Sequence, residues 1–140
     1  MLHRLTWLTL ACLVLAGPAL AAAPDEATVQ GLYEGVVAAG GRQKVEARVV
    51  ATGDAKYDVF LREMLPGGKT KALGKIQGTT EGDAVRFSGK IGDAEWTGAF
   101  SGGAIAGSCG SGKWALERVE RKPPSLGAKP PSDAVVLLAV

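Results

Sequence analysis

The spacing of glycine along the chain limits the possible folds more than any other feature. From Gly31 onward, short alternating runs are separated by glycine-rich turns at intervals of about 8–12 residues, as in antiparallel sandwiches and barrels. In the run 43–51, for example, Val45, Ala47 and Val49 fall on one face of an extended chain and charged residues fall on the other. The chain has no asparagine, so its 20 glycines must supply the turn positions with positive φ. The pattern predicts an all-β fold.

The segments between the turns predict a series of short strands. They cover residues 32–37, 43–51, 56–63, 71–77, 84–88, 94–100, 104–108 and 113–119. The fourth is expected to be weak and broken at Gly74, because glycine has no side chain to pack. The turns are short enough for hairpins, which predicts an antiparallel up-and-down meander of about eight strands over residues 31–120. We expect a small barrel or a barrel-like sandwich, since closure removes exposed edges.

One hydrophobic face of these strands is expected to form the core. Its predicted members are Val45, Val49, Tyr57, Val59, Leu61, Val85, Phe87, Trp96, Phe100 and Leu116.

Residues 1–21 have the pattern of a secretory signal peptide. A short basic start at His3-Arg4 precedes an apolar stretch, and Ala19-Leu20-Ala21 is a small-x-small cleavage site. The apolar run is shorter than the roughly 20 residues that a membrane anchor needs. The pattern predicts a periplasmic or secreted protein that begins at Ala22. Residues 22–30 would then be a lead-in with a short helical turn at 25–30.

The other end of the chain is rich in proline. Two Lys-Pro-Pro-Ser units, Lys122–Ser125 and Lys129–Ser132, predict an extended linker over residues 121–133, because proline fixes φ and donates no backbone hydrogen bond. The apolar segment Ala134–Val140 reads as the start of a further domain that this chain lacks. The alternative is that Val135–Leu138 folds back and joins the barrel as an edge strand.

The charge balance and the residue types present argue against several classes of function. Removing the signal segment takes Arg4 from the 16 basic residues and leaves 15 basic against 14 acidic residues. This balance gives no electrostatic reason to expect nucleic acid or an anionic membrane as a partner. The only histidine, His3, lies in the same segment, so Ser-His-Asp and Cys-His sites cannot form and a zinc site would lack nitrogen ligands. No catalytic, cofactor-binding or metal-binding residue is therefore predicted.

The sequence Gly107–Trp114 partly matches a phosphate-binding loop. It satisfies the first seven positions of G-x-x-x-x-G-K-[ST], but Trp114 replaces the hydroxyl residue that would bind magnesium. The residues after Lys113 also continue as a strand, whereas the loop must open a helix. We interpret the match as coincidental and expect no nucleotide binding.

Carboxylates offer another catalytic possibility. Asp83, Asp93 and Glu95 could converge across neighbouring hairpins, as a two-carboxylate glycosidase site requires. The favoured alternative is that they are turn and solvent-face residues, where acidic side chains are common.

The aromatic residues and the cysteine each allow two interpretations. Trp96, Trp114 and Tyr33 could form a platform for sugar rings, but the apolar residues that share their faces favour a place in the core. Cys109 has no partner in the mature chain, so it is either a tolerated free thiol or the site of an intermolecular disulfide that links a dimer.

Several segments resemble the amino-terminal β-rich region of secreted bacterial proteins of the 3-keto-disaccharide hydrolase domain family. Gly31–Gly35 is similar to that region's opening Gly-x-Tyr-x-Gly strand. Val119–Lys122, Leu126–Pro131 and Ala134–Leu137 match its closing Val-Glu-Arg-Lys, Leu-Gly-Ala-Lys-Pro-Pro and Ala-Val-Val-Leu steps in order. The six-residue proline-containing step is the most specific of these matches.

Two departures from the family pattern limit what the resemblance implies. Pro123–Ser125 replaces Ser-Pro-Thr, and Leu138–Val140 stands where the family continues with Phe-Asp-Gly and its catalytic domain. The resemblance therefore implies a truncated, non-catalytic accessory or binding module in a glycan-degradation context, whose partner is a glycan or the missing catalytic domain. The alternatives are a hydrolase with a carboxylate-only site and a structural spacer without a ligand.

Overall fold

The computed structural model describes residues 22–123 and 126–128, and the elements below belong to that part of the chain. They are α1 (Glu26–Val29), β1 (Gly31–Ala38), β2 (Arg42–Gly53), β3 (Lys56–Met64), η1 (Pro66–Gly68), β4 (Thr70–Glu81), β5 (Ala84–Ile91), β6 (Ala94–Ser101), β7 (Ala104–Cys109) and β8 (Gly112–Val119). The predicted signal segment 1–21, the second Lys-Pro-Pro-Ser unit and the apolar segment 134–140 lie outside the described residues. No described helix is long and apolar enough to cross a membrane.

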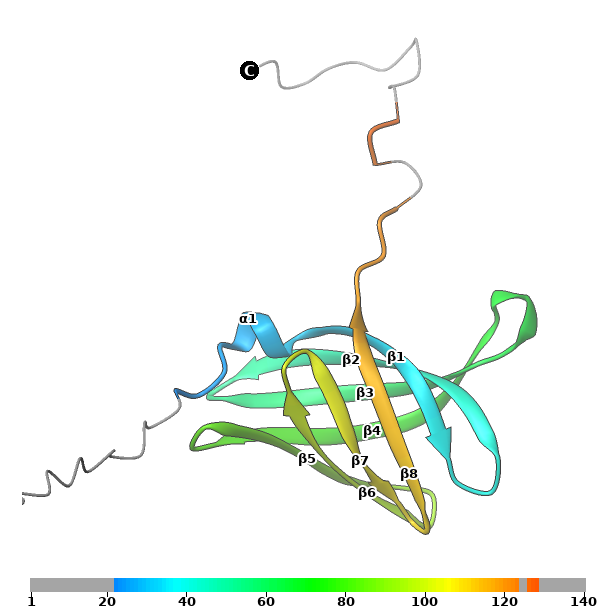
Figure 1. Cartoon of the computed structure of the whole chain (residues 1–140), viewed down its shortest axis with the longest axis horizontal. Coiled ribbons are helices and arrows are strands. Elements are labelled where there is room, and N and C mark those ends of the chain that lie inside the picture. The colour runs from blue at the N-terminus through cyan, green and yellow to red at the C-terminus, as the bar shows by residue number, and fades with distance from the viewer. Residues whose placement is uncertain (1–21, 124–125, 129–140) are drawn as a thin grey trace, which may run out of the picture.

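The eight strands form a closed antiparallel barrel in sequence order (Figure 1). Each strand pairs with the next, and β1 also pairs with β8, so that Leu32 faces Arg48 on one side and Val119 on the other. The predicted all-β meander is confirmed, and it is a barrel. β4 pairs with β5 only over Gln77–Glu81, so the first part of β4 has a partner on one side alone. The alternative that Val135–Leu138 joins the barrel as an edge strand concerns residues outside the described part.

The predicted break in the fourth strand is wrong. β4 continues through Gly74 to Glu81. Gly74 pairs with Leu61, and the register between β3 and β4 shifts directly after Leu61. An added Cβ at Gly74 would lie 3.0 Å from two side-chain carbons of Ile91. The glycine therefore marks an irregularity at a close contact with a neighbouring side chain, and the strand does not end there.

Buried side chains fill the interior of the barrel. Every predicted core residue is buried except Phe100, which is partly buried and packs against the others. The core also contains Val29, Tyr33, Val37, Ala47, Ile76, Ile105, Cys109 and Trp114. The inward positions of all eight strands thus contribute to one core.

Large residues in the interior lie over glycines on neighbouring strands. A Cβ at Gly78 would come within 2.6 Å of the Phe87 ring, and one at Gly98 would come equally close to the Trp114 indole. Small barrels commonly alternate large and small inward residues in this way. The glycines therefore make room for the aromatic side chains.

Other glycines allow the backbones of paired strands to approach closely. A Cβ at Gly35 would lie 2.0 Å from the Ala115 carbonyl oxygen, and one at Gly107 would lie 1.8 Å from that of Thr97. Only a residue without a side chain fits at such positions. They are points where the sheet can bend sharply enough to close the barrel.

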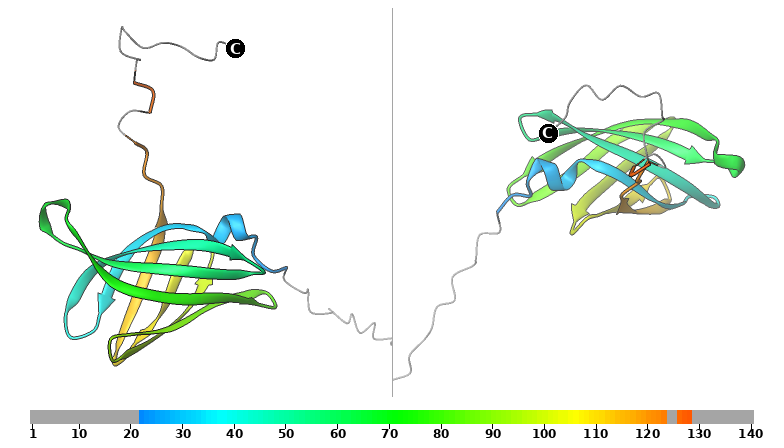
Figure 2. Two further views of the ribbon diagram at one scale, coloured as in Figure 1. Left: turned by 180° about the vertical axis from the view of Figure 1, so that it is seen from behind. Right: turned by 90° about the horizontal axis from the view of Figure 1, so that it is seen from above.

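The lead-in residues cover one end of the barrel, as the two further views in Figure 2 show. Val29 of α1 is fully buried, and the Tyr33 hydroxyl donates a hydrogen bond to its carbonyl oxygen at 2.5 Å. Arg118 Nη1 donates to the Thr28 carbonyl oxygen at 2.6 Å. Burial raises the pKa of Tyr33, and nearby Arg118 opposes this rise. The helical turn predicted at 25–30 is confirmed.

Candidate functional site

The three aromatic residues considered as a sugar platform are buried. Tyr33, Trp114 and Trp96 are 0%, 2% and 6% exposed. The two indole rings pack 5.6 Å apart between centroids, and Trp114 Nε1 donates to the carbonyl oxygens of Thr97 and Ser108. All three occupy inward strand positions, so the core interpretation is correct and no exposed platform exists at these residues.

Cys109 also points into the core. It is a free thiol, 2% exposed, and burial raises its pKa. A disulfide with a second molecule requires an accessible sulfur, so this position opposes the dimer considered from the sequence.

The less favoured alternative from the sequence, in which Asp83 converges with Asp93 and Glu95, does not occur. Asp83 precedes β5, whereas Asp93 and Glu95 follow it. The eight residues of this strand separate its two ends by about 25 Å. Consecutive hairpins turn at opposite ends of a barrel, and this geometry keeps Asp83 away from the other two.

The partial phosphate-loop motif forms a β-hairpin. Residues up to Cys109 belong to β7, and β8 begins at Gly112 and carries Lys113 on its exposed side. The predicted continuation as a strand is confirmed, so no helix amino terminus faces the loop.

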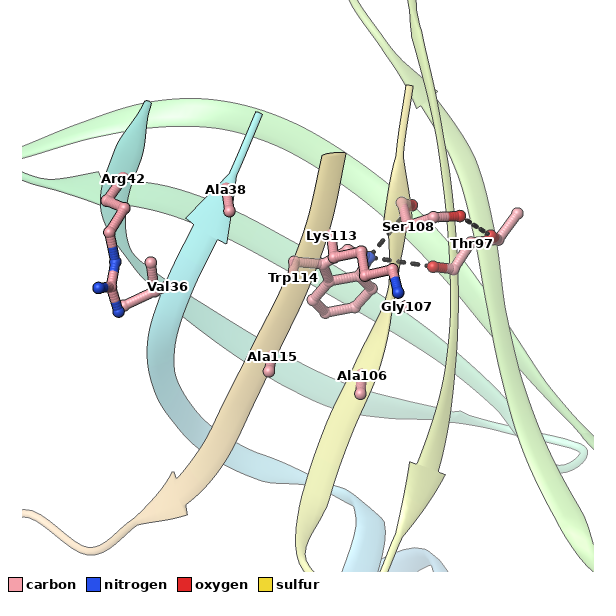
Figure 3. Close-up of a pocket in the computed structure, with 10 residues that line it drawn as sticks. All are labelled: Val36, Ala38, Arg42, Thr97, Ala106, Gly107, Ser108, Lys113, Trp114 and Ala115. Carbon is pink, nitrogen blue, oxygen red and sulfur yellow. Dashed lines mark hydrogen bonds between the residues drawn. The ribbon is translucent and has the colours of Figure 1, made fainter. Parts of the chain in front are cut away.

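The main surface feature is an outer hollow of about 750 Å³ on the wall formed by β1, β8, β7 and β6 (Figure 3). Its lining residues are Val36, Ala38, Arg42, Thr97, Ala106, Gly107, Ser108, Lys113, Trp114 and Ala115. The apolar side chains among them are Val36, Ala38, Ala106 and Ala115, which are outward positions on three adjacent strands. A groove of this size with few polar groups is typical of a binding site.

Polar groups lie around this apolar surface. Arg42 and Lys113 supply two cations, and neither belongs to an ion pair formed within the described residues. The hydroxyls of Thr97 and Ser108 form a hydrogen bond of 2.9 Å at the β6–β7 side of the hollow. The hollow is therefore suited to an apolar group that carries negative charge.

The hollow exists because the outer positions of β1, β7 and β8 carry small side chains. The outward residues of β2 are instead long and charged, as at Lys44 and Arg48, which is the usual pattern for a strand face in contact with water. Ala106 on β7 and Ala115 on β8 are directly paired, so two methyl groups lie side by side where long side chains would otherwise cover the sheet.

Ion pairs connect the chain just after β8 to the outer face of β1 and β2. Arg121 Nε donates to Glu34 Oε1 at 3.0 Å, and Arg121 Nη2 lies 2.8 Å from Glu46 Oε2. We call these three residues the Arg121 clasp. Glu34 and Glu46 are directly opposite on β1 and β2, and hydrogen bonding to Glu34 is the main cause that raises the pKa of Arg121. Arg121, assigned to the linker from the sequence, is thus held by the barrel.

Glu46 makes the clasp more than a surface ion pair. It is 4% exposed, the one buried charged residue in the described part of the chain. Its neighbour across the sheet, Glu34, is also acidic. The Arg121 guanidinium therefore offsets both the cost of burying the Glu46 charge and the repulsion between the two carboxylates. Sequence inspection missed this group because 87 residues separate Arg121 from Glu34. The signal available in the sequence was that Glu34 and Glu46 both fall on outward-facing positions of their strands.

The clasp adjoins the outer hollow. Val36 lines the hollow and follows Glu34 by two residues on the same face of β1, a distance of about 7 Å along the strand. Glu34, to which Arg121 is bound, therefore lies next to the edge of the hollow that Val36 forms.

Within residues 22–123 and 126–128, no three His, Cys, Asp or Glu residues are grouped in a way that could hold a metal ion. Comparisons with protein-family models, with curated proteins and with solved structures found no match.

Proposed function

We propose that this chain is an exported, non-catalytic accessory module that works beside a sugar-processing catalytic domain. The observation that best supports this proposal is that the Arg121 clasp lies next to the outer hollow. The clasp fixes where the polypeptide leaves the barrel, and the hollow supplies an apolar surface at that place. A module built in this way can hold a following unit against its own wall.

The sequence resemblance supports the same assignment. In the 3-keto-disaccharide hydrolase domain family, the segment similar to Val119–Leu137 joins a β-rich region to the catalytic domain. We favour this domain over a glycan as the partner of the hollow. Sugar sites commonly use exposed aromatic rings, and Tyr33, Trp96 and Trp114 are buried here.

Binding in trans tests the proposal. The mature chain, residues 22–140, would be titrated with a separately produced catalytic domain from a protein of the resembling family. We expect saturable binding that Ala115→Glu weakens by tenfold or more, because this change puts a carboxylate into the apolar part of the hollow. Ala72→Glu is the matched control, since Ala72 is exposed on β4, a strand that does not line the hollow.

Two further assays distinguish the alternatives. Turnover of 3-keto-disaccharides by the mature chain alone would contradict the proposal and favour a carboxylate hydrolase. A glycan array that gives a signal lost in Ala115→Glu would replace the catalytic domain with a glycan as the partner. If neither ligand binds, the proposal fails and a structural spacer is the better description.

A further inference from the structure

We propose that the outer hollow is the docking surface for the apolar segment Ala134–Val140 of this same chain. Residues 129–140 lie outside the described part, and only their sequence enters here. The segment and a separate catalytic domain would occupy the same surface, so a catalytic domain that binds there must displace the segment.

The closed barrel determines how such a segment can bind. Ala134–Val140 consists of seven consecutive apolar residues, a composition that favours β-structure and burial. A segment of this kind would ordinarily add to an open sheet edge, but β1 and β8, the strands next to the point where the chain leaves the barrel, pair with each other and leave no edge there. Burial on this side of the barrel therefore uses side-chain contacts on the outer wall, and the outer hollow is an apolar depression on that wall.

The linker is long enough to bring the segment to the hollow. Glu34 of the clasp lies about 7 Å from Val36 along β1, so Arg121 is bound to a residue next to the near side of the hollow. The twelve residues 122–133 span up to about 37 Å at the polyproline rise. The linker also contains a turn, in which the Leu126 amide donates to the Pro123 carbonyl oxygen at 2.9 Å and Gly127 has φ +82°. The chain can thus leave the clasp and reverse its direction.

The chemistry of the segment matches that of the hollow. Its aliphatic side chains fit against the methyl groups of Ala38, Ala106 and Ala115. Asp133, the charged residue directly before the segment, would meet a hollow that carries Arg42 and Lys113. Attachment through a short linker also gives the segment a high effective concentration at this surface, which a separate partner lacks.

The test compares methyl contacts in the full mature chain. We expect nuclear Overhauser contacts between the methyl groups of Leu137 or Leu138 and those of Ala106 or Ala115. They should be unchanged when the protein is diluted tenfold, because the contact is intramolecular. Leu137→Asp should abolish them and shift the backbone amide resonances of Val36 and Ala106.

Two substitutions in the barrel provide the matched comparison. Ala115→Arg should abolish the contacts, whereas Ala72→Arg, at an exposed position of β4, a strand that does not line the hollow, should leave them intact. Ala38→Arg, at the exposed end of β1, serves as a second hollow variant if Ala115→Arg does not fold.

The proposal is overturned if the segment makes no contact with the hollow in the full chain. It is equally overturned if the contacts vanish on dilution, which would make a second copy the occupant. A loss of contacts in Ala72→Arg equal to that in Ala115→Arg would place the docking surface elsewhere.

Discussion

At the scale of single residues, Gly107 is the position that tolerates least change. Its hypothetical Cβ lies 1.8 Å from the Thr97 carbonyl oxygen and close to the backbone of Gly98, so neither neighbour can move as a flexible side chain could. We predict that Gly107→Ala lowers the free energy of unfolding by at least about 1–3 kcal/mol, the usual cost of overpacking. Chemical denaturation of the mature chain measures this change.

Gly41→Ala is the control for that substitution. No atom lies within 4 Å of a Cβ at Gly41, and its φ is not positive in the glycine-favouring range. We expect its free energy of unfolding to stay within about 0.5 kcal/mol of the parent value. Equal effects of the two substitutions would contradict the close approach at Gly107.

A second residue-scale prediction concerns Cys109. Because the thiol is buried and its pKa is raised, we expect slow reaction with a disulfide reagent in the native protein and rapid reaction in denaturant. The double variant Cys109→Ser with Ser111→Cys should react rapidly in the native state, since Ser111 lies on an exposed turn. Fast native reaction of Cys109 would instead show that the end of β7 opens readily.

The sequence predicted individual core residues well because successive residues of a strand alternate between the core and the solvent. Val45, Tyr57 and Trp96 could be placed by alternation alone, and all three are buried. Alternation could not reveal which glycines lie beneath aromatic rings, as Gly98 lies beneath Trp114. That relation depends on the register between strands, which a single sequence does not state.

At the scale of elements, the Arg121 clasp joins the end of β8 to β1 and β2. Arg121→Ala would leave the buried Glu46 carboxylate beside Glu34 without the guanidinium that both contact. Removing one partner of a buried ion pair is destabilising because the remaining charge stays desolvated. We therefore predict a lower thermal unfolding midpoint for Arg121→Ala, measured by circular dichroism.

Lys122→Ala is the matched control, because Lys122 is exposed and belongs to none of the ion pairs of the described residues. Glu46→Gln in the Arg121→Ala background should recover part of the loss, since a neutral amide costs less to bury than a carboxylate. Equal midpoints for Arg121→Ala and Lys122→Ala would mean that the clasp adds nothing to stability.

The clasp and the hollow also mark the limit of sequence-based prediction. The strands were predictable because their signals are local, and most turns between them follow from glycine, except that Asp54 and Ala55 adopt positive φ between β2 and β3. Glu34, Glu46 and Arg121 come together only when the barrel closes, and the hollow requires knowing that Ala106 and Ala115 are paired. For the same reason the carboxylate alternative needed the structure to be decided, because Asp83 and Asp93 lie at opposite ends of one strand.

At the scale of the whole molecule, closure should protect the first and last strands as well as the middle ones. Backbone amides at the edge of an open sheet exchange with solvent quickly, but β1 and β8 each have two partners. We predict that the backbone amides of Tyr33 and Leu116 exchange as slowly as that of Ile76 in β4, at the rate set by global unfolding. Hydrogen exchange followed by NMR measures this.

Exchange at Tyr33 and Leu116 that is a hundredfold or more faster than at Ile76 would contradict the prediction. It would show that the β1–β8 pairing opens independently of the rest of the barrel.

The β1–β8 pairing also sets an order of events for a chain that is synthesised from its amino terminus. Leu32 emerges early, but its partner Val119 follows only after nearly the whole barrel has been delivered. Closing so long a loop carries a large entropic cost and makes this final pairing slow. Until Val119 arrives, β1 keeps one unpaired side that other chains could join. The time during which this protein can aggregate is therefore determined by the speed of its synthesis as much as by its stability once folded.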